Sequence, residues 1–276
     1  MNRSWRRRTT DGSQLTLRGI GLGYIGLFVA LPIIALGARA FAGGLPRLWE
    51  NLTQPEALFS LRLTVIMAGA MILINVVMGT LTAWFLVRHR FPLRGLMNAL
   101  IDLPFAIPTN VTGLMLVVLY GPQSSIGSFL SAGGVEVIYA KPGIVLALLF
   151  VTFPFVVRAV QPVLLELDRD VEEAASTLGA GRLAVFRKVI LPSLLPAILT
   201  GAALSFSRAL GEFGSVVMVA GNIPLRTQVA PVFVYGEIES DNPEGALGVS
   251  VVLLVGSLVV LILLNLLQRL GRRQDE

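Results

Sequence analysis

An arginine, a glutamate and two serines recur at helical spacing inside one apolar stretch, where together they could bind an anion. Gly201, Ser205, Arg208, Glu212 and Ser215 follow one another at intervals of four, three, four and three residues, so a helix would place them on one face. A guanidinium and serine hydroxyls supply the donors that a dianion needs. At the centre of a bilayer an arginine costs about 2.5–3.5 kcal/mol on insertion scales, so this face should avoid lipid.

These residues support two interpretations. In the first, Arg208 attracts a dianion, and Ser205 and Ser215 act as neutral donors. In the second, Arg208 and Glu212 form an ion pair between positions i and i+4 that holds helices together, and the serines serve helix packing. Because a paired arginine retains little charge for an anion, the sequence favours the ion pair.

A second candidate anion site follows a pair of prolines. Pro104 and Pro108 remove backbone donors, so they should break or kink the helix that contains them. A helix that restarts near Pro108 would direct free N–H groups at an anion, together with the side chains of Thr109, Asn110 and Thr112. The alternative is a proline kink that serves packing alone, and the sequence favours it.

Composition excludes several catalytic and cofactor sites. The chain has no cysteine and a single histidine, His89, which leaves no transition-metal constellation. Its only lysines, Lys141 and Lys188, belong to no phosphate-binding GxxxxGK motif, so the chain supplies no P-loop. We therefore expect no catalytic residue, no metal site and no cofactor in this chain.

Long apolar runs must position these residues. The sequence is 54% apolar and 14% charged, and runs of Val, Leu, Ile, Ala and Gly without period-two alternation favour helices over barrel strands. A bilayer core of about 30 Å requires about 20 helical residues. The sequence therefore predicts an all-α polytopic membrane protein with six transmembrane helices, at about residues 19–41, 63–87, 99–120, 143–160, 194–220 and 245–267.

The basic residues predict the orientation of the chain. Six spans place both termini on one side, and 16 of the 22 basic residues fall on that side, among them Arg88, Arg158 and Arg182. The positive-inside bias therefore puts both termini in the cytoplasm. The first apolar run is longer than the core of a usual signal peptide, so we expect it to be retained as a span.

Three parts are expected along the chain. Residues 1–60 would comprise a cytoplasmic N-terminal arm (1–18), the first transmembrane helix and an outer loop (42–60); residues 61–268 would form the core with five transmembrane helices; and residues 269–276 would form a cytoplasmic tail. Further outer connections are expected at 121–142, which is rich in turn formers, and at 222–244, which is acidic.

The longest cytoplasmic connection, at about 165–192, has the pattern of a helix. Asp170 is a suitable N-cap, and Glu173 completes a capping-box pair. One apolar face, at positions i, i+3, i+4 and i+7, consists of Val171, Ala174, Ala175 and Leu178. Gly179 and Gly181 would terminate this helix, and a second amphipathic stretch would stop at Pro192. Such a helix either contacts another protein or lies on the membrane surface.

This connection resembles the EAA loop of bacterial ABC-importer permeases. The resemblance rests on Glu173-Ala174-Ala175, on Gly179 and on Val189-Ile190-Leu191-Pro192, with Val189 where the family usually has Ile. It implies that the loop is a coupling helix, seated in a groove of a separate ATP-hydrolysing subunit. The contact residues that it implies are Glu172, Glu173, Ala174, Ala175, Leu178 and Gly179.

Other segments are similar to the sulfate/thiosulfate permeases of that family, in particular the T-type subunit. They begin at Asp102, Pro154, Arg208 and Ala220, and they read DLPFAIPT, PFVVRAVQPVL, RALGEFGSVV and AGNIP. The resemblance covers about residues 63–268 and implies a type I ABC-importer permease fold that forms half of a translocation pathway. Molybdate and tungstate permeases share much of this pattern and are the alternative.

The family also implies a set of partners. The chain would pair with a second permease subunit in the bacterial inner membrane, two cytoplasmic ATPase subunits would bind ATP and Mg, and a periplasmic sulfate-binding protein would deliver the anion. Two other classes remain open: an ion-coupled secondary transporter with Arg208 and Glu212 as a proton relay, and a structural membrane anchor. The EAA resemblance and the lack of an evident inverted repeat weigh against the secondary transporter.

Overall fold

The structure, a computed structural model, describes residues 12–272, and within that range it contains helices and turns but no strand. The all-α prediction is confirmed. Most of the predicted N-terminal arm, and residues 273–276 of the predicted tail, lie outside the described residues. The chain divides after Glu50 into two compact units.

The N-terminal unit is a helix with a π-helical turn inside it. α1 (Gly12–Ile25) continues through η1 (Gly26–Ala30) into α2 (Leu31–Phe41), and α3 (Gly44–Thr53) follows. Among residues 16–41 Ala40 alone is buried within the chain, so this apolar segment needs lipid or a partner around it.

Two segments of this unit differ from the prediction. The first helix begins before residue 19, because α1 also includes residues 12–18 of the predicted arm, where each added residue gains one helical hydrogen bond. Residues 44–53, predicted as loop, form α3, whose first turn contains Pro46, where the missing N–H is tolerated.

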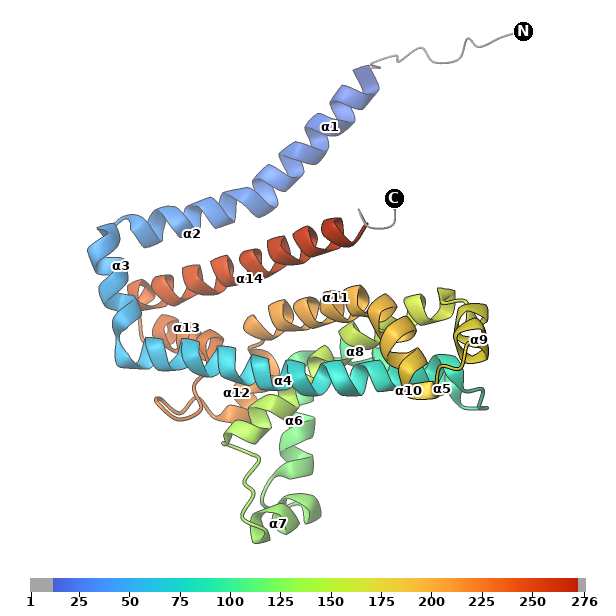
Figure 1. The fold of residues 1–276 in the computed structure, drawn as a ribbon. Helices are drawn as coiled ribbons and strands as arrows, with labels where there is room; N and C mark the ends of the chain where they lie inside the picture. The colour runs from blue at the N-terminus through green and yellow to red at the C-terminus, as the bar shows by residue number, and fades with distance from the viewer. Residues whose placement is uncertain (1–11, 273–276) are drawn as a thin grey trace. The chain divides into compact units, whose positions relative to one another are not determined.

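Four long helices form the frame of the second unit (Figure 1). They are α4 (Pro55–Arg88), α8 (Lys141–Glu166), α11 (Leu191–Leu210) and α14 (Pro243–Arg272). α8 packs along α4 and α11, and α11 also packs on α14. A Cβ at Gly201 would lie 2.7 Å from the Cα of Val156, so this glycine lets the backbones of α11 and α8 approach closely, as small residues do in membrane bundles.

Three buried apolar clusters hold the described part of the second unit together, and the smallest joins Ala57 of α4 to Val249 of α14. Of the two larger ones, one includes Leu63, Met67 and Ile144, and it joins the first halves of α4 and α8 to the end of α11 and to residues 216–220. The other includes Leu86 and Ile190, and it joins the C-terminal ends of α4 and α8 to the start of the helix that returns through α11. The predicted loop at 165–192 is therefore anchored on a packed core.

The third predicted span is broken at Pro108, whereas Pro104 lies inside the first of its two helices. α5 (Arg94–Ala106) and α6 (Thr109–Tyr120) meet at an angle of 113°. Pro108 is the residue before α6 and has an extended backbone, so the predicted restart near Pro108 is confirmed. A simple kink, which the sequence favoured, does not describe a bend this large.

The fifth predicted span, 194–220, has the wrong bounds. The return helix begins at Arg182 with α10 (Arg182–Val185), passes through a π-helical turn, η2 (Phe186–Ile190), and continues as α11 to Leu210. It does not stop at Pro192, because the π-helical turn η2 ends just before that proline and changes the backbone hydrogen-bond pattern there, so the helix continues as α11. After Leu210 a turn separates α12 (Gly214–Ala220) from α11.

The remaining helices lie in predicted connections. α7 (Ser125–Ala132) and α13 (Ala230–Glu239) occur within the segments 121–142 and 222–244, which were predicted as loops, and α9 (Arg169–Thr177) occurs in the predicted coupling loop. α9 and α10 lie at the end of the bundle where α4 finishes (Figure 1). Within residues 12–272, five helices are long and apolar enough to cross a membrane, and the bent pair α5–α6 brings the number to six.

Candidate functional site

The loop helix α9 begins with a side-chain cap. The carboxylate of Asp168 accepts a hydrogen bond from the backbone N–H of Asp170 at 3.0 Å, and α9 starts at Arg169. The predicted cap at Asp170 is therefore wrong by two residues. Asp168 has the extended backbone that a cap requires, whereas Asp170 lies inside the first turn, where its negative charge complements the helix dipole.

The end of α9 is a Schellman motif at Gly179. The N–H of Gly179 bonds to the carbonyl of Ser176 at 3.0 Å, and the N–H of Ala180 bonds to that of Ala175 at 3.1 Å. Gly179 has φ +87°, yet a Cβ there would meet no atom within 4 Å. Glycine is thus required by the left-handed backbone and not by lack of space.

The six predicted contact residues point in two directions. Glu173, Ala174, Leu178 and Gly179 are exposed, and Leu178 reaches 88% exposure. Ala175 is half-buried against the core cluster beneath the loop. Glu172 is also half-buried, and its carboxylate forms an ion pair with Arg88 at the end of α4. An open groove of about 590 Å³ beside α9 is lined by Trp84, Glu172, Glu173, Ser176, Thr177, Arg182, Val185, Phe186 and Ile190.

Two of the predicted spans are broken, into α5–α6 and α11–α12, and their second halves, α6 and α12, meet at their N-terminal ends. A Cβ at Gly214, the first residue of α12, would lie 2.1 Å from Oδ1 of Asn110 and 2.3 Å from Oγ1 of Thr109. A Cβ at Gly113 would lie 2.8 Å from the carbonyl oxygen of Ser215. The structure therefore brings the predicted residues of α6 together with those of α12.

Arg208 and Glu212 form the ion pair of the second interpretation. Nη1 of Arg208 lies 2.7 Å from Oε2 of Glu212; the Glu212 side chain is 1% exposed and that of Arg208 is 36% exposed. Oε1 of Glu212 also accepts hydrogen bonds from the backbone N–H of Ser215 at 2.9 Å and from its hydroxyl at 2.8 Å. Glu212 thus joins the turn after α11 to the first turn of α12.

The predicted single helical face is not formed. α11 ends at Leu210, so Glu212 and Ser215 lie beyond it. Ser205 faces elsewhere: its hydroxyl lies 3.2 Å from Nδ2 of Asn75, in a buried cluster with Thr152 that connects α4, α8 and α11. The spacing pattern assumed one continuous helix, and the turn at Gly211 breaks it.

Removal of the Glu212 carboxylate is expected to destabilise this turn. In a Glu212→Ala variant Arg208 loses its partner inside the bundle and Ser215 loses an acceptor, so we expect a loss of about 2–4 kcal/mol. A lower thermal unfolding temperature of the purified protein would reveal it. Ser215→Ala, which removes one hydroxyl bond worth about 1 kcal/mol, is the control. An unchanged unfolding temperature in Glu212→Ala would contradict the prediction.

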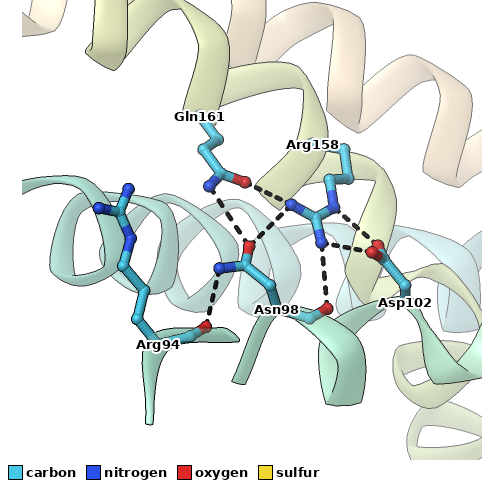
Figure 2. Close-up of polar contacts among 5 residues, drawn as sticks. All are labelled: Arg94, Asn98, Asp102, Arg158 and Gln161. Atoms are coloured by element: carbon cyan, nitrogen blue, oxygen red, sulfur yellow. Dashed lines mark hydrogen bonds and ion pairs between the residues drawn. The ribbon is translucent and has the colours of Figure 1, made fainter. Parts of the chain in front are cut away.

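Sequence reasoning missed a polar cluster centred on Arg158 (Figure 2). Arg158 lies inside α8, near the end of the predicted span 143–160, where it had been counted only as one of the basic residues on the side of the termini. Its Nε and Nη2 donate to the two carboxylate oxygens of Asp102 at 2.7 and 2.5 Å, and Nη1 donates to Oδ1 of Asn98 at 2.9 Å and to Oε1 of Gln161 at 2.6 Å. Nη2 also donates to the backbone carbonyl of Asn98 at 3.1 Å.

This cluster ties the first half of the broken span to α8. Asp102 and Asn98 belong to α5, and Arg158 and Gln161 belong to α8. The signal available in the sequence was a single acidic residue in one apolar run and a single arginine at the end of another. Because each run was treated separately, the two charges were not paired.

The acidic segment at 222–244 carries one perturbed group. The hydroxyl of Tyr235 donates to Oε1 of Glu239 at 2.6 Å. This hydrogen bond, and then the negative charge of the carboxylate, raise the pKa of Tyr235 above its ordinary value. Tyr235 therefore remains protonated at neutral pH.

Apolar helices, two broken helices and a capped loop helix are the features expected of a multi-pass membrane permease with the type I ABC-importer fold. A family model described as "Binding-protein-dependent transport system inner membrane component" matches residues 75–274. The chain belongs to this family, and the predicted family resemblance is confirmed.

Named relatives are similar over most of their length. The chain is 45% identical over 250 residues to the sulfate transport system permease protein CysT of Synechocystis sp., covering 91% of this chain and 87% of that protein. It is 43% identical over 268 residues to the protein of the same name from Salmonella typhimurium, covering 97% and 96%. The Escherichia coli protein of that name is 42% identical over 268 residues, again covering 97% and 96%.

Solved structures share the fold. A bacterial ABC transporter involved in the import of the acidic polysaccharide alginate matches with a TM-score of 0.75 at 15% identity, over 96% of this chain and 97% of that chain. The alginate transporter in complex with its pentasaccharide-bound periplasmic protein gives 0.77 at 16% identity, over 100% and 99%. The MetNI methionine transporter gives 0.61 at 18% identity, over 82% and 98%.

Proposed function

We propose that this chain is the permease subunit of an ATP-driven importer of sulfate and thiosulfate, and that it forms half of the translocation pathway. The similarity to sulfate transport system permeases carries the proposal, since identities of 42–45% extend over at least 87% of those relatives. The motifs at Asp102, Pro154, Arg208 and Ala220 fall within the matched region.

In this proposal α9 is the contact with a cytoplasmic ATPase subunit. Its support is the exposure of Glu173, Ala174 and Leu178 on a helix fixed at both ends, by the Asp168 cap and the Gly179 turn. Val171 and Leu178, on the predicted apolar face of α9, are both exposed, and grouped exposed apolar side chains mark a surface that a partner can cover. The ATPase subunits would bind ATP and Mg, and this chain would act as a transport subunit and not as an enzyme.

The anion would pass near the meeting point of the two broken helices. Thr109, Asn110 and Thr112 stand at the start of α6, where the first-turn N–H groups lack helical partners and favour negative charge. The hydroxyl of Thr112 is buried and has no hydrogen-bond partner. Arg208 would add positive charge nearby, although its ion pair with Glu212 reduces that charge. Ser215 would act indirectly, through its hydrogen bonds to Glu212, and Ser205 through its hydrogen bond with Asn75, which helps to hold the long helices together.

The orientation and the partners complete the proposal. The sequence assigns 16 of the 22 basic residues to the side of the two termini, and this positive-inside bias supports an orientation with both termini in the cytoplasm of a bacterial cell. A second permease subunit, two ATPase subunits and a periplasmic sulfate-binding protein would assemble with this chain in the inner membrane.

Reconstitution tests the substrate. The complex with its ATPase subunits, sister permease and binding protein is placed in liposomes, and ATP hydrolysis is measured with sulfate, thiosulfate or molybdate. We expect sulfate and thiosulfate to stimulate hydrolysis by about fivefold or more, and molybdate to do so weakly. Stimulation by molybdate or tungstate alone would identify the alternative substrate class.

Two other outcomes would favour a different class of protein. Uptake by this chain alone, driven by a proton gradient, would favour a secondary transporter. ATP hydrolysis that no anion stimulates would favour a structural anchor.

A further inference from the structure

We propose that the ion pair between Arg88 and Glu172 is the link through which movement of the coupling helix α9 is passed to the long span α4. The inference rests on the proposed coupling function and identifies the residues that would perform it inside this chain. It also gives Glu172 a different role from Glu173, because Glu172 binds within its own chain.

The pair is sheltered and joins segments far apart in the sequence. Nη2 of Arg88, the last residue of α4, contacts Oε1 of Glu172 in α9, and the side chains are 10% and 22% exposed. A charge pair with so little exposure is screened far less than one on the open surface. Loss of either partner would leave the other charge without compensation.

Aromatic side chains hold the Arg88 guanidinium in place. Its Cζ lies 5.2 Å from the centroid of the Trp84 ring, one helical turn earlier in α4. Trp84 in turn makes an edge-to-face contact with Phe186, with the ring centroids 5.9 Å apart. Phe186 begins η2, so the same group of side chains touches α4, α9 and the start of the return helix.

The Arg88–Glu172 ion pair connects α9 to α4, two helices that are not consecutive in the sequence. α9 is joined covalently to α8 before it and to α10 after it, and its packing neighbours are α10 and η2. It also reaches α4 directly, through the long side chains of Arg88 and Glu172. When α9 is displaced by a partner, this pair therefore transmits the displacement to the end of α4, beside the packing of Ala175 and Phe186 on the core cluster.

α4 can carry such a displacement across the whole bundle. It is one helix of 34 residues, or about 50 Å. At its far end the hydroxyl of Thr64 accepts a hydrogen bond from the backbone N–H of Ala230, at the start of α13, at 2.8 Å, and Ala57 packs against Phe233. The loop end and the α13 end of the protein are thus connected by one continuous element.

A charge-reversal experiment on the reconstituted complex tests the link. The variants are Arg88→Gln, Glu172→Gln, Arg88→Glu and the double exchange Arg88→Glu/Glu172→Arg, with Arg90→Gln as the matched control, because Arg90 is exposed two residues beyond Arg88. The measurements are co-purification of the ATPase subunits, ATP hydrolysis with and without sulfate, and sulfate taken up per ATP hydrolysed.

We expect each single variant to keep its ATPase subunits but to lose about fivefold or more in sulfate stimulation and in uptake per ATP. The double exchange should recover a large part of that loss, and Arg90→Gln should match the unmodified chain. Glu172→Gln removes the charge with almost no change in volume, so it reports on the link even where Arg88→Glu fails to fold.

Three results would overturn the inference while the proposed function stands. They are normal stimulation in both glutamine variants, loss of the ATPase subunits from the single variants, and a double exchange no better than the single ones. If the unmodified complex shows no sulfate-stimulated hydrolysis at all, the proposed function itself fails, and the inference fails with it.

Discussion

Alanine in place of Arg158 is expected to reduce sulfate-stimulated ATP hydrolysis and uptake by about tenfold or more in the reconstituted complex. The guanidinium forms hydrogen bonds with Asp102, Asn98 and Gln161, and these bonds hold α5 against α8. α5 is the first half of a span that bends by 113° at Pro108, so without the clamp it can shift around that break. The start of α6, which carries the proposed anion contacts, would move with it.

Two further variants distinguish the loss of the two parallel hydrogen bonds between Arg158 and Asp102 from the loss of the positive charge. Arg158→Lys retains the positive charge but cannot bind Asp102 through two parallel bonds, so we expect an intermediate loss. Arg158→Ala/Asp102→Ala removes the unpaired carboxylate and should unfold at a higher temperature than Arg158→Ala, by an amount equivalent to about 1–2 kcal/mol, a low value because both side chains are partly exposed. Full transport in Arg158→Ala would show that α5 needs no such clamp.

The architecture was predictable because apolar length and proline position are local signals. The runs near 63–87 and 143–160 became α4 and α8, of which α4 extends mainly at its start, from Pro55, and α8 mainly at its end, to Glu166. Pro108 correctly indicated a helix restart. The turn at Gly211 was missed, since Arg208 and Glu212 fit helical spacing whether or not the helix continues.

The candidate sites were predictable only where the residues are neighbours in the sequence. The N–H groups of Gly179 and Ala180 end α9 through bonds to the carbonyls of Ser176 and Ala175, all within six residues, and the sequence identified that end. Arg158 and Asp102 are 56 residues apart, and Arg88 and Glu172 are 84 apart. Their pairing depends on which faces of separate helices meet, and the periodicity of a single helix does not contain that information.

Valine in place of Gly179 is expected to uncouple ATP hydrolysis from uptake. At φ +87° a residue with a Cβ costs about 1–2 kcal/mol, and a β-branched side chain is the least tolerated there. The Schellman bonds to Ser176 and Ala175 would weaken, α9 would end at a different angle, and Leu178 would leave its exposed position. We expect sulfate-stimulated uptake per ATP to fall about tenfold, while unstimulated hydrolysis persists.

Two controls assign this loss to the backbone at Gly179. Asparagine is similar in volume to valine but adopts the left-handed conformation more readily, so Gly179→Asn should retain most of the coupling. Gly181, two residues on, has φ −67° and open space around its Cα, so Gly181→Val should behave as the unmodified chain does. Equal losses in Gly179→Asn and Gly179→Val would instead point to steric exclusion by the partner's groove. Wild-type coupling in Gly179→Val would show that α9 transmits movement without its fixed end, and the mechanical role proposed for this loop would then be wrong.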